Sequence, residues 1–208
     1  MSDPAPTVYL VDDDVSVLRG LGRLLAAAGM KVAAFDSPRE FLGRLDPAAP
    51  GCLILDVAMP GLNGLELQQA LAARGSALPV VFLTGRGDIP MSVQAMKRGA
   101  ADFLTKPVDD EMLLATIRNA LEKNRASRGA REELAQVEKR LAKLTARERE
   151  VLERVVTGRL NKQIAAELGT VEKTIKVHRA HVMQKMGVRT LADLVRLAGR
   201  AGIRTGRG

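Results

Sequence analysis

The chain has 208 residues, of which 46% are hydrophobic, and these values suggest one or two globular domains. No apolar stretch reaches the roughly 18 residues of a membrane span, and the start MSDPAPTVYL lacks the basic and apolar regions of a secretion signal, so we expect neither. Cys52 is the single cysteine, which excludes an internal disulfide and a cysteine metal cluster and fits a cytoplasmic location.

The net charge of +8 is unevenly distributed. Residues 1–124 hold 12 Lys and Arg against 15 Asp and Glu, residues 125–143 hold six against three, and the residues from Leu144 onward hold 14 against six. An acidic first half joined to a basic last third suggests two separate roles, and the basic part suggests a polyanionic partner. Charge alone leaves open a basic surface that serves only solubility.

Up to Asn124, short apolar runs alternate with amphipathic stretches. The apolar runs, which we interpret as strands, are Val8–Val11, Val32–Phe35, Cys52–Leu55, Val80–Leu83 and Phe103–Leu104. The predicted helices are Val15–Ala28, Pro38–Leu45, Leu65–Arg74, Met91–Arg98 and one that begins at Asp109. This alternation predicts a doubly wound α/β domain over residues 1–124, flavodoxin-like, with five parallel strands and helices on both faces.

The fifth helix has no clear end, because only Gly129 interrupts the stretch from Asp110 to Lys143 and no proline occurs there. We therefore predict a long helical linker over residues 125–143. A heptad seam is formed by Ala130, Leu134, Val137, Leu141 and Leu144. Two interpretations stay open: a short coiled-coil dimer contact, or a solvated linker helix with one face packed lightly on a domain.

After Leu144 the pattern is entirely helical. Glycines separate four segments, which are Ala146–Thr157, Asn161–Leu168, Glu172–Met186 and Leu191–Ala201. They predict an all-α domain over residues 144–203, followed by a disordered tail at residues 204–208. The second and third segments, joined at Gly169, have the pattern of a helix-turn-helix. His178 and His181 lie three residues apart without a third ligand, so we expect phosphate or local contacts there rather than a metal.

The residues that come after the predicted strands of the first domain carry reactive groups. Asp12, Asp13 and Asp14 come after the first strand, Asp56 after the third, Thr84 after the fourth and Lys106 after the fifth. Such strand ends form the site in doubly wound sheets. Crowded carboxylates repel each other, and Mg²⁺ relieves this repulsion. A carboxylate beside Mg²⁺ can attack a phosphoryl donor while a lysine neutralises charge. Helix capping explains any one of these acids, but not the whole set.

These segments resemble the four signatures of response-regulator receiver domains, in Val11–Asp14, Leu55–Gly64, Leu83–Gly85 and Thr105–Pro107. Gly85–Pro107 resembles the FixJ-type branch in particular. The resemblance implies that Asp56 is the phosphoacceptor, that Thr84 and Lys106 contact the phosphoryl group, and that Phe103 reports the state of the switch. It implies a Mg²⁺ site made of Asp12, Asp13, Asp56 and the backbone carbonyl of Ala58.

The basic domain resembles the LuxR-type helix-turn-helix of the NarL/FixJ regulators, in Leu144–Leu152, Gly158, Asn161–Ala165 and Lys173–His178. The resemblance implies that the helix around Thr174–Met186 enters the major groove and that Leu191–Ala201 forms a dimer face. It places Lys176, Val177 and Ala180 at base edges, which carry sequence information. It places four residues mostly at phosphates, which fix register: Lys162, Lys173, Thr174 and Arg179.

Two positions depart from the family pattern. Val171 stands where the family often has a serine that caps the recognition helix, and loss of an N-cap costs roughly 0.5–2 kcal/mol. Either Thr170 caps the helix one residue earlier, or the helix begins loosely until DNA binds. Ala180 lacks a hydrogen-bonding group where relatives can carry lysine, which leaves contact with a thymine methyl group as its means of reading a base.

The two resemblances together imply a two-component response regulator rather than an enzyme, apart from slow Mg²⁺-dependent self-phosphorylation and dephosphorylation at Asp56. The implied partners are a sensor histidine kinase, two half-sites in double-stranded promoter DNA, RNA polymerase, and a second copy of the chain on phosphorylation, with no membrane contact. Activation by dimerisation and activation by release of a covered recognition helix both stay open.

Three rival classes fit less well. An aspartate-nucleophile phosphohydrolase usually carries its nucleophile after the first strand, whereas Asp56 follows the third. A constitutive architectural DNA-binding protein does not need the intact acid set. A ligand-sensing LuxR-type activator needs an aromatic-lined pocket, and only 2% of the residues are aromatic.

Overall fold

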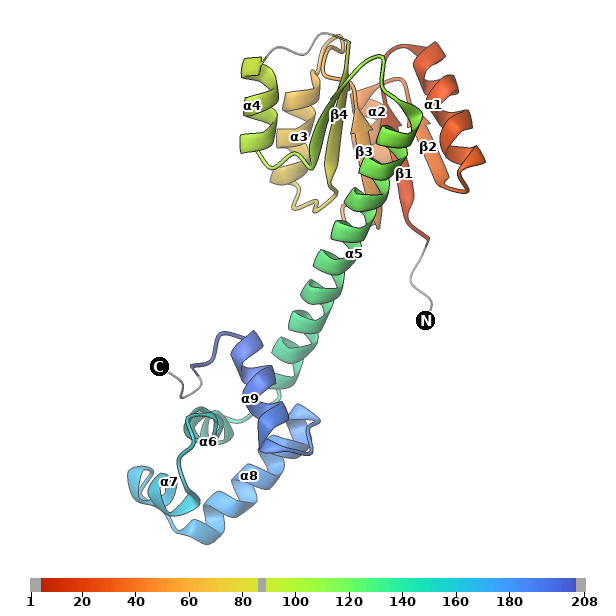
Figure 1. The fold of residues 1–208 in the computed structure, drawn as a ribbon. Helices are drawn as coiled ribbons and strands as arrows, with labels where there is room; N and C mark the ends of the chain where they lie inside the picture. The colour runs from red at the N-terminus through yellow and green to blue at the C-terminus, as the bar shows by residue number, and fades with distance from the viewer. Residues whose placement is uncertain (1–4, 86–88, 205–208) are drawn as a thin grey trace. The chain divides into compact units, whose positions relative to one another are not determined.

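The computed structural model describes residues 5–85 and 89–204 and divides the chain into two compact units, Met1–Arg128 and Gly129–Gly208 (Figure 1). The boundary falls within helix α5 (Asp110–Leu141), which continues through Gly129 as the sequence predicted. Within the described residues, no helix combines the length and the apolar character that a membrane crossing requires. Of the predicted tail at residues 204–208, all but Arg204 lie outside the described residues.

The first unit is built on a sheet of five parallel strands, which confirms the predicted fold class. The strands are β1 (Thr7–Val11), β2 (Lys31–Phe35), β3 (Gly51–Leu55), β4 (Val80–Thr84) and β5 (Asp102–Thr105). Their order across the sheet is β2-β1-β3-β4-β5. The chain therefore reverses its direction of winding between β1 and β3, and in such sheets the crevice at this point is the usual position of a site.

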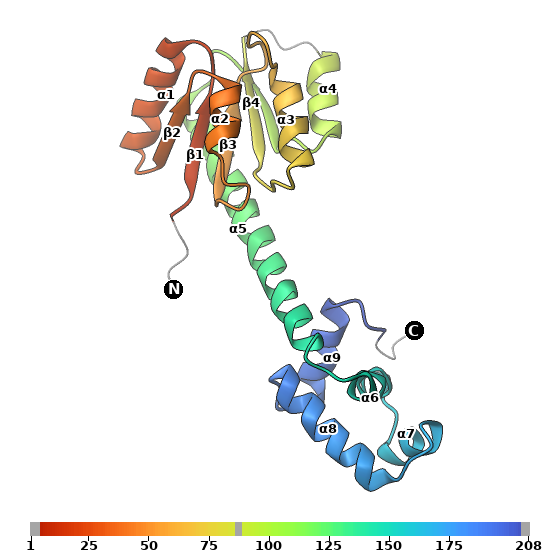
Figure 2. The same ribbon diagram turned by 180° about the vertical axis from the view of Figure 1, so that it is seen from behind.

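Helices cover both faces of this sheet (Figures 1 and 2). They are α1 (Val15–Ala27), α2 (Pro38–Arg44), α3 (Gly64–Ala73), α4 (Ile89–Lys97) and the first half of α5. Alternate residues of each strand face opposite cores, as the period of two requires. In β1, Val8 and Leu10 pack with α1 and α5, whereas Val11 packs on the side of α2, α3 and α4. This double burial explains why the inner strands β1, β3 and β4 are mostly apolar.

The second unit confirms the four predicted helices, which are α6 (Ala146–Val156), α7 (Asn161–Glu167), α8 (Glu172–Met186) and α9 (Leu191–Arg200). Their core includes Leu152, Ile164, Ile175, Met186 and Leu194, all fully buried. Gly187 ends α8 in the left-handed conformation, with φ of 65°, which glycine adopts without strain. Helix α8 packs against both α6 and α7, the arrangement of a helix-turn-helix.

The last turns of α5 belong to the second core. Val137 and Leu141 are only 3% and 7% exposed and pack with the residues of that core, while Leu134 is 36% exposed. Arg140 also donates from Nη1 to the carbonyl of Met186 at 2.9 Å. Leu144, a further position of the seam, also packs against this core. Three positions of the heptad seam are thus occupied within one chain, and a coiled-coil contact stays a prediction for Ala130 and Leu134.

Candidate acidic site and nucleic-acid interface

Two aspartates meet at the C-terminal edge of the sheet. Asp12 follows β1 and Asp56 follows β3, and the two strands are hydrogen-bonded neighbours. The backbone N–H of Asp56 donates to the carbonyl of Val11 at 2.9 Å, which fixes the two strand ends against each other. Asp12 is 5% exposed and Asp56 is 7% exposed. A pair of buried carboxylates side by side needs a compensating cation.

Lys106 supplies that cation in the described structure. Its Nζ atom lies 2.5 Å from Oδ2 of Asp12 and 3.1 Å from Oδ1 of Asp56. The backbone N–H of Lys106 donates to the carbonyl of Thr84 at 2.7 Å, and the peptide bond from Lys106 to Pro107 is cis. Thr84 itself is buried at the end of β4. The structure therefore brings together one residue from each of the strand ends that the sequence singled out.

The proton affinities reflect this arrangement. Burial raises the pKa of Asp12, and hydrogen bonds from Lys106 and from the N–H of Asp14 offset only part of that effect. Burial by itself would lower the pKa of Lys106, but its hydrogen bonds to Asp12 and Asp56 outweigh burial and keep the pKa above its ordinary value. The amine is therefore held in its charged form, as neutralisation of a transferred anion requires.

The other predicted metal ligands lie on the rim. Asp13 and Ala58 are exposed, and the N–H of Ala58 donates to Oδ2 of Asp56 at 2.8 Å. Across the described ranges, no three Asp, Glu, His or Cys side chains are arranged as a ready metal cluster. The available donors are carboxylate and carbonyl oxygens only, which suits a hard cation such as Mg²⁺. The amine of Lys106 lies between the two buried carboxylates.

Gly64 is a part of this site that sequence reasoning did not single out for a role of its own. A Cβ atom at Gly64 would lie 2.4 Å from the backbone oxygen of Asp56 and 3.1 Å from the ring of Phe82. Its N–H donates to the carbonyl of Val57 at 3.0 Å. The start of α3, capped by Asn63 and Glu66, therefore packs directly on the backbone of Asp56.

Phe103 lies in β5 beside α4, half-buried on the core that α2, α3 and α4 cover. The centre of its ring is 6.1 Å from that of Phe82 in β4. Phe103 therefore lies at the margin between core and solvent, and its switch role stays a prediction.

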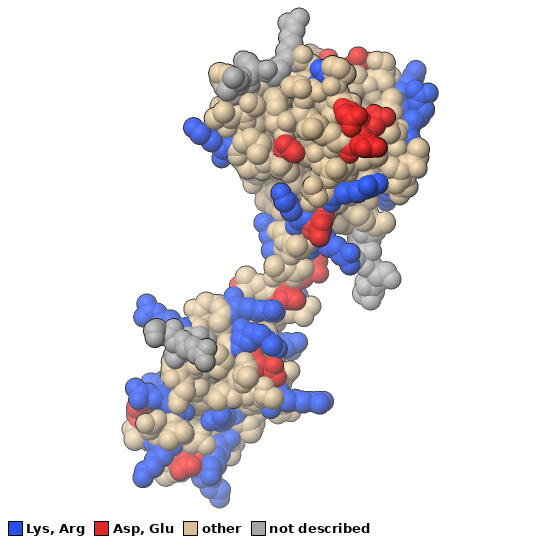
Figure 3. Space-filling model, in the orientation of Figure 1, with Lys and Arg blue, Asp and Glu red and all other residues tan. Residues whose placement is uncertain are grey.

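The outer face of α8 carries most of the predicted DNA contacts. Lys173, Lys176, Val177 and Ala180 are exposed, as is Lys162 in α7. The inner stripe, formed by Ile175, Val182 and Met186, is buried as predicted. Figure 3 shows Lys and Arg over much of the visible face of this unit, among few carboxylates. The helix thus presents cations and two small apolar groups to solvent.

The remaining two predicted contacts are half-buried: Thr174 and Arg179. Arg179 donates from Nη1 to Oδ1 of Asn161 at 3.1 Å and so joins α8 to the start of α7. Val171 is the N-cap residue of α8, without a side-chain cap, so Thr170 does not occupy that position. His181 lies 3.6 Å from the buried carboxylate of Glu148, a local contact of the kind we expected.

Glu148 anchors α8 to α6. Its carboxylate accepts from Nζ of Lys185 at 2.6 Å and from the N–H of Thr145 at 2.8 Å. The hydrogen bond from Lys185 is the main reason why the pKa of Glu148 lies below its ordinary value. No sequence pattern indicates this pairing, because Glu148 and Lys185 are far apart along the chain.

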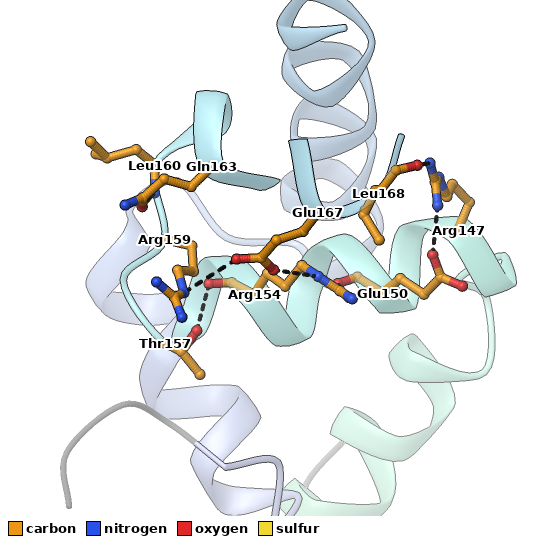
Figure 4. A network of polar contacts seen from close by, with 9 residues as sticks. All are labelled: Arg147, Glu150, Arg154, Thr157, Arg159, Leu160, Gln163, Glu167 and Leu168. Atoms are coloured by element: carbon orange, nitrogen blue, oxygen red, sulfur yellow. Dashed lines mark hydrogen bonds and ion pairs between the residues drawn. The ribbon is translucent and has the colours of Figure 1, made fainter. Parts of the chain in front are cut away.

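A second polar network joins α6 to α7 (Figure 4). Glu167 at the end of α7 accepts from Nε of Arg154 at 3.0 Å and lies 3.5 Å from Nε of Arg159. Arg147 pairs with Glu150 at 2.8 Å and donates from Nη2 to the carbonyl of Leu168 at 2.6 Å. These contacts fix α7 and the turn that leads to α8.

Comparisons with known proteins agree with this geometry. Residues 8–118 match the family described as "Response regulator receiver domain", and residues 142–198 match "Bacterial regulatory proteins, luxR family". The chain is 46% identical to nodulation protein W of Bradyrhizobium diazoefficiens, over 94% of this chain and 86% of that protein. It is 45% identical to the transcriptional regulatory protein FixJ of Azorhizobium caulinodans, over 94% and 93% respectively. A low-resolution structure of the response regulator StyR superimposes with a TM-score of 0.87, at 49% identity over 94% of this chain and 99% of that chain.

Proposed function

Because the chain belongs to the response regulators that join a receiver domain to a LuxR-type DNA-binding domain, we propose that phosphorylation of Asp56 controls its binding to DNA. As a member of this family, the chain is a transcriptional regulator. The observation that carries the proposal is the buried carboxylate of Asp56, 3.1 Å from the charged amine of Lys106 and beside Asp12.

In the proposed reaction, a carboxylate oxygen of Asp56 attacks the phosphorus of a phosphohistidine on a sensor kinase. The new bond joins this oxygen to phosphorus, and the bond from phosphorus to the imidazole nitrogen breaks, with the electron pair staying on nitrogen. Lys106 neutralises charge on the phosphoryl oxygens, and the hydroxyl of Thr84 donates a hydrogen bond to one of them. Water would later hydrolyse the acyl phosphate slowly, which makes the site a timer.

The donor set supports a Mg²⁺ site made of Asp12, Asp13, Asp56 and the carbonyl of Ala58. When bound, the cation would offset the negative charge that a phosphoryl group brings to the buried carboxylates. The side chains would have different roles, because Asp12 and Asp13 hold the cation while Asp56 remains the nucleophile.

The phosphoryl group adds about 1.5 to 2 negative charges at Asp56. We propose that Thr84 and Phe103 then move inward and remodel the surface of α4 and β5, so that two chains dimerise. Dimerisation raises the local concentration of the second helix-turn-helix and favours two half-sites about one DNA turn apart. Release of a covered recognition helix is the alternative route.

At the DNA, Lys176, Val177 and Ala180 would face base edges in the major groove. The proposed phosphate contacts are Lys162, Lys173, Thr174 and Arg179. The exposure of most of these side chains on α7 and α8 supports their proposed contact with DNA. Contacts with RNA polymerase and a cytoplasmic location, where promoter DNA is accessible, belong to the same proposal.

The test is the intact mass of the chain after incubation with Mg²⁺ and a small phosphodonor, beside Asp56→Asn. We expect one added phosphoryl group on the wild-type chain and none on the variant, followed by dimerisation of the wild-type chain only. Addition to both, or normal dimerisation and activation of Asp56→Asn by the phosphodonor, would contradict the assignment of Asp56.

A further inference from the structure

Glu167 holds two arginines with one carboxylate (Figure 4). Its Oε2 atom lies 3.0 Å from Nε of Arg154, which comes from α6, and its Oε1 atom lies 3.5 Å from Nε of Arg159, which precedes α7. The side chains of Arg154 and Arg159 are 30% and 55% exposed. Both guanidinium groups pair with the same acid, but Arg154 is also held within α6, because its Nη1 donates to the carbonyl of Glu150 at 2.9 Å. Among the described residues, the only ion-pair partner of Arg159 is Glu167.

Arg159 lies at the end of α7 that the proposed DNA contact uses. It is three residues before Lys162, and the neighbouring Asn161 accepts from Arg179 of α8. The start of α7, with Leu160 68% exposed, is thus open to solvent beside the recognition helix. A guanidinium released from Glu167 at this place would add to the cationic surface formed by Lys162 and Lys173.

The affinity of a protein for duplex DNA rises with every cation that reaches a phosphate, whatever the DNA sequence. A carboxylate that pairs with an arginine competes with the phosphates for it. Because Glu167 is itself 39% exposed, its pairing is weak enough to act as a partial restraint rather than a permanent lock. Phosphate contacts add affinity without sequence information, so a restraint on them improves discrimination between sites.

We propose that Glu167 is a specificity-determining residue, which restrains Arg159 and so limits the sequence-independent affinity of the helix-turn-helix for DNA. The proposal rests on the proposed DNA contact of α7 and α8. It assigns Glu167 a role in binding in addition to its contact between α6 and α7.

The test compares the full-length chain, treated with Mg²⁺ and a phosphodonor, with its variant Glu167→Gln on duplex DNA of random sequence. The control is Glu153→Gln, which makes the same change of net charge from an exposed position of α6 without an ion pair among the described residues. We expect Glu167→Gln to bind random duplex about 2- to 5-fold more tightly than wild type. The plot of log affinity against log salt should be steeper by up to about 0.9, as expected when Arg159 gains one phosphate contact.

The double variant Arg159→Ala, Glu167→Gln distinguishes restraint from general electrostatics. If Arg159 is the group released, most of the increase in affinity caused by Glu167→Gln disappears in the double variant. Arg159→Ala alone should change the affinity little. An effect of Glu167→Gln equal to that of Glu153→Gln would overturn the proposal. So would weaker binding with a loss of helical circular dichroism, since Glu167 would then serve only to hold α7. Failure of the wild-type chain itself to bind any duplex would instead reject the proposed DNA contact.

Discussion

The Nζ atom of Lys106 lies 2.5 Å from Oδ2 of Asp12, although the two residues are 94 positions apart in the chain. This contact places the amine where a metal cation would otherwise balance the buried carboxylates of Asp12 and Asp56. The proposed Mg²⁺ ion would therefore act on the same negative charge as Lys106, and the removal of one cation should increase the influence of the other.

We predict that Lys106→Ala destabilises the first unit by about 1–3 kcal/mol, because it leaves two largely buried carboxylates without a cation. Mg²⁺ should restore part of that loss and should stabilise the variant more than wild type. Denaturant unfolding followed by the fluorescence of Tyr9, the only tyrosine in a chain without tryptophan, measures both effects. Lys31→Ala, at an exposed position of β2, is the control. Equal responses of the two variants to Mg²⁺ would refute the shared role.

The second prediction concerns Gly64, whose missing side chain allows α3 to approach Asp56. Gly64→Ala should cost about 1–3 kcal/mol, because the added Cβ meets the backbone oxygen of Asp56, which cannot move aside easily. The phosphorylation of Gly64→Ala, followed as intact mass over time, should also be slower than that of wild type. Gly20→Ala in α1 provides a matched comparison, since nothing lies within 4 Å of its Cβ, and it should stabilise by roughly 0.5–1 kcal/mol. Identical stability changes for the two glycines would contradict the contact.

Lys106 shows what the sequence could predict, and Gly64 shows what it could not. The order of strands and helices was predicted from short apolar runs, which indicate strands, and from apolar residues at helical spacing, which indicate helices. The reactive side chains were predicted from their positions directly after those strands. The local pattern also placed Val171 at the start of α8. The clash at Gly64 and the pairs of Glu148 with Lys185 and of Glu167 with two arginines depend on packing between elements, which no local pattern encodes. Helix ends differ from the predicted ends by one or two residues. At α4 the cause is local, because Pro90 is the second residue of the helix, where its missing N–H costs nothing.

The third prediction is a pH dependence of the second unit. The pKa of Glu148 is lowered in the folded chain, so its contribution to stability is present above the ordinary value of 4.5 and is lost as the pH falls through the lowered pKa. Glu148→Gln should lose roughly 1–2 kcal/mol at neutral pH. The difference from wild type should shrink below pH 4.5, as measured by thermal unfolding with far-UV circular dichroism. A difference that stays constant across this range would mean that the charge of Glu148 is not involved.

The fourth prediction uses the uncapped start of α8. Val171 has the extended backbone of an N-cap residue, with φ of −98° and ψ of 151°, but no side-chain oxygen. Val171→Ser should therefore raise the stability of the second unit by about 0.5–2 kcal/mol. Val171→Ala separates the gain of a hydroxyl from the loss of an exposed apolar group. If the serine and alanine variants unfold alike, the helix start is already satisfied by other means.

The last prediction separates base reading from phosphate contact on α8. Lys176 is exposed and lies 3.5 Å from Glu172, one turn earlier on the same helix. If Lys176 reads a base, Lys176→Ala should weaken binding to a selected site by roughly 1–3 kcal/mol and relax the preference at one position. Lys162→Ala should instead weaken all duplexes alike and lower the salt dependence by about one phosphate contact.

Selection of sites from a random duplex pool, repeated with each variant, measures the preference directly. If Lys176→Ala weakens binding to all duplexes alike, Lys176 contacts a phosphate rather than a base. Val177 and Ala180 would then have to supply the sequence preference. Both present only apolar atoms, whose available partner in the major groove is the methyl group of thymine. Sites selected by the Lys176→Ala variant should in that case keep their preference for A·T pairs, whereas loss of all preference would exclude these two residues as readers.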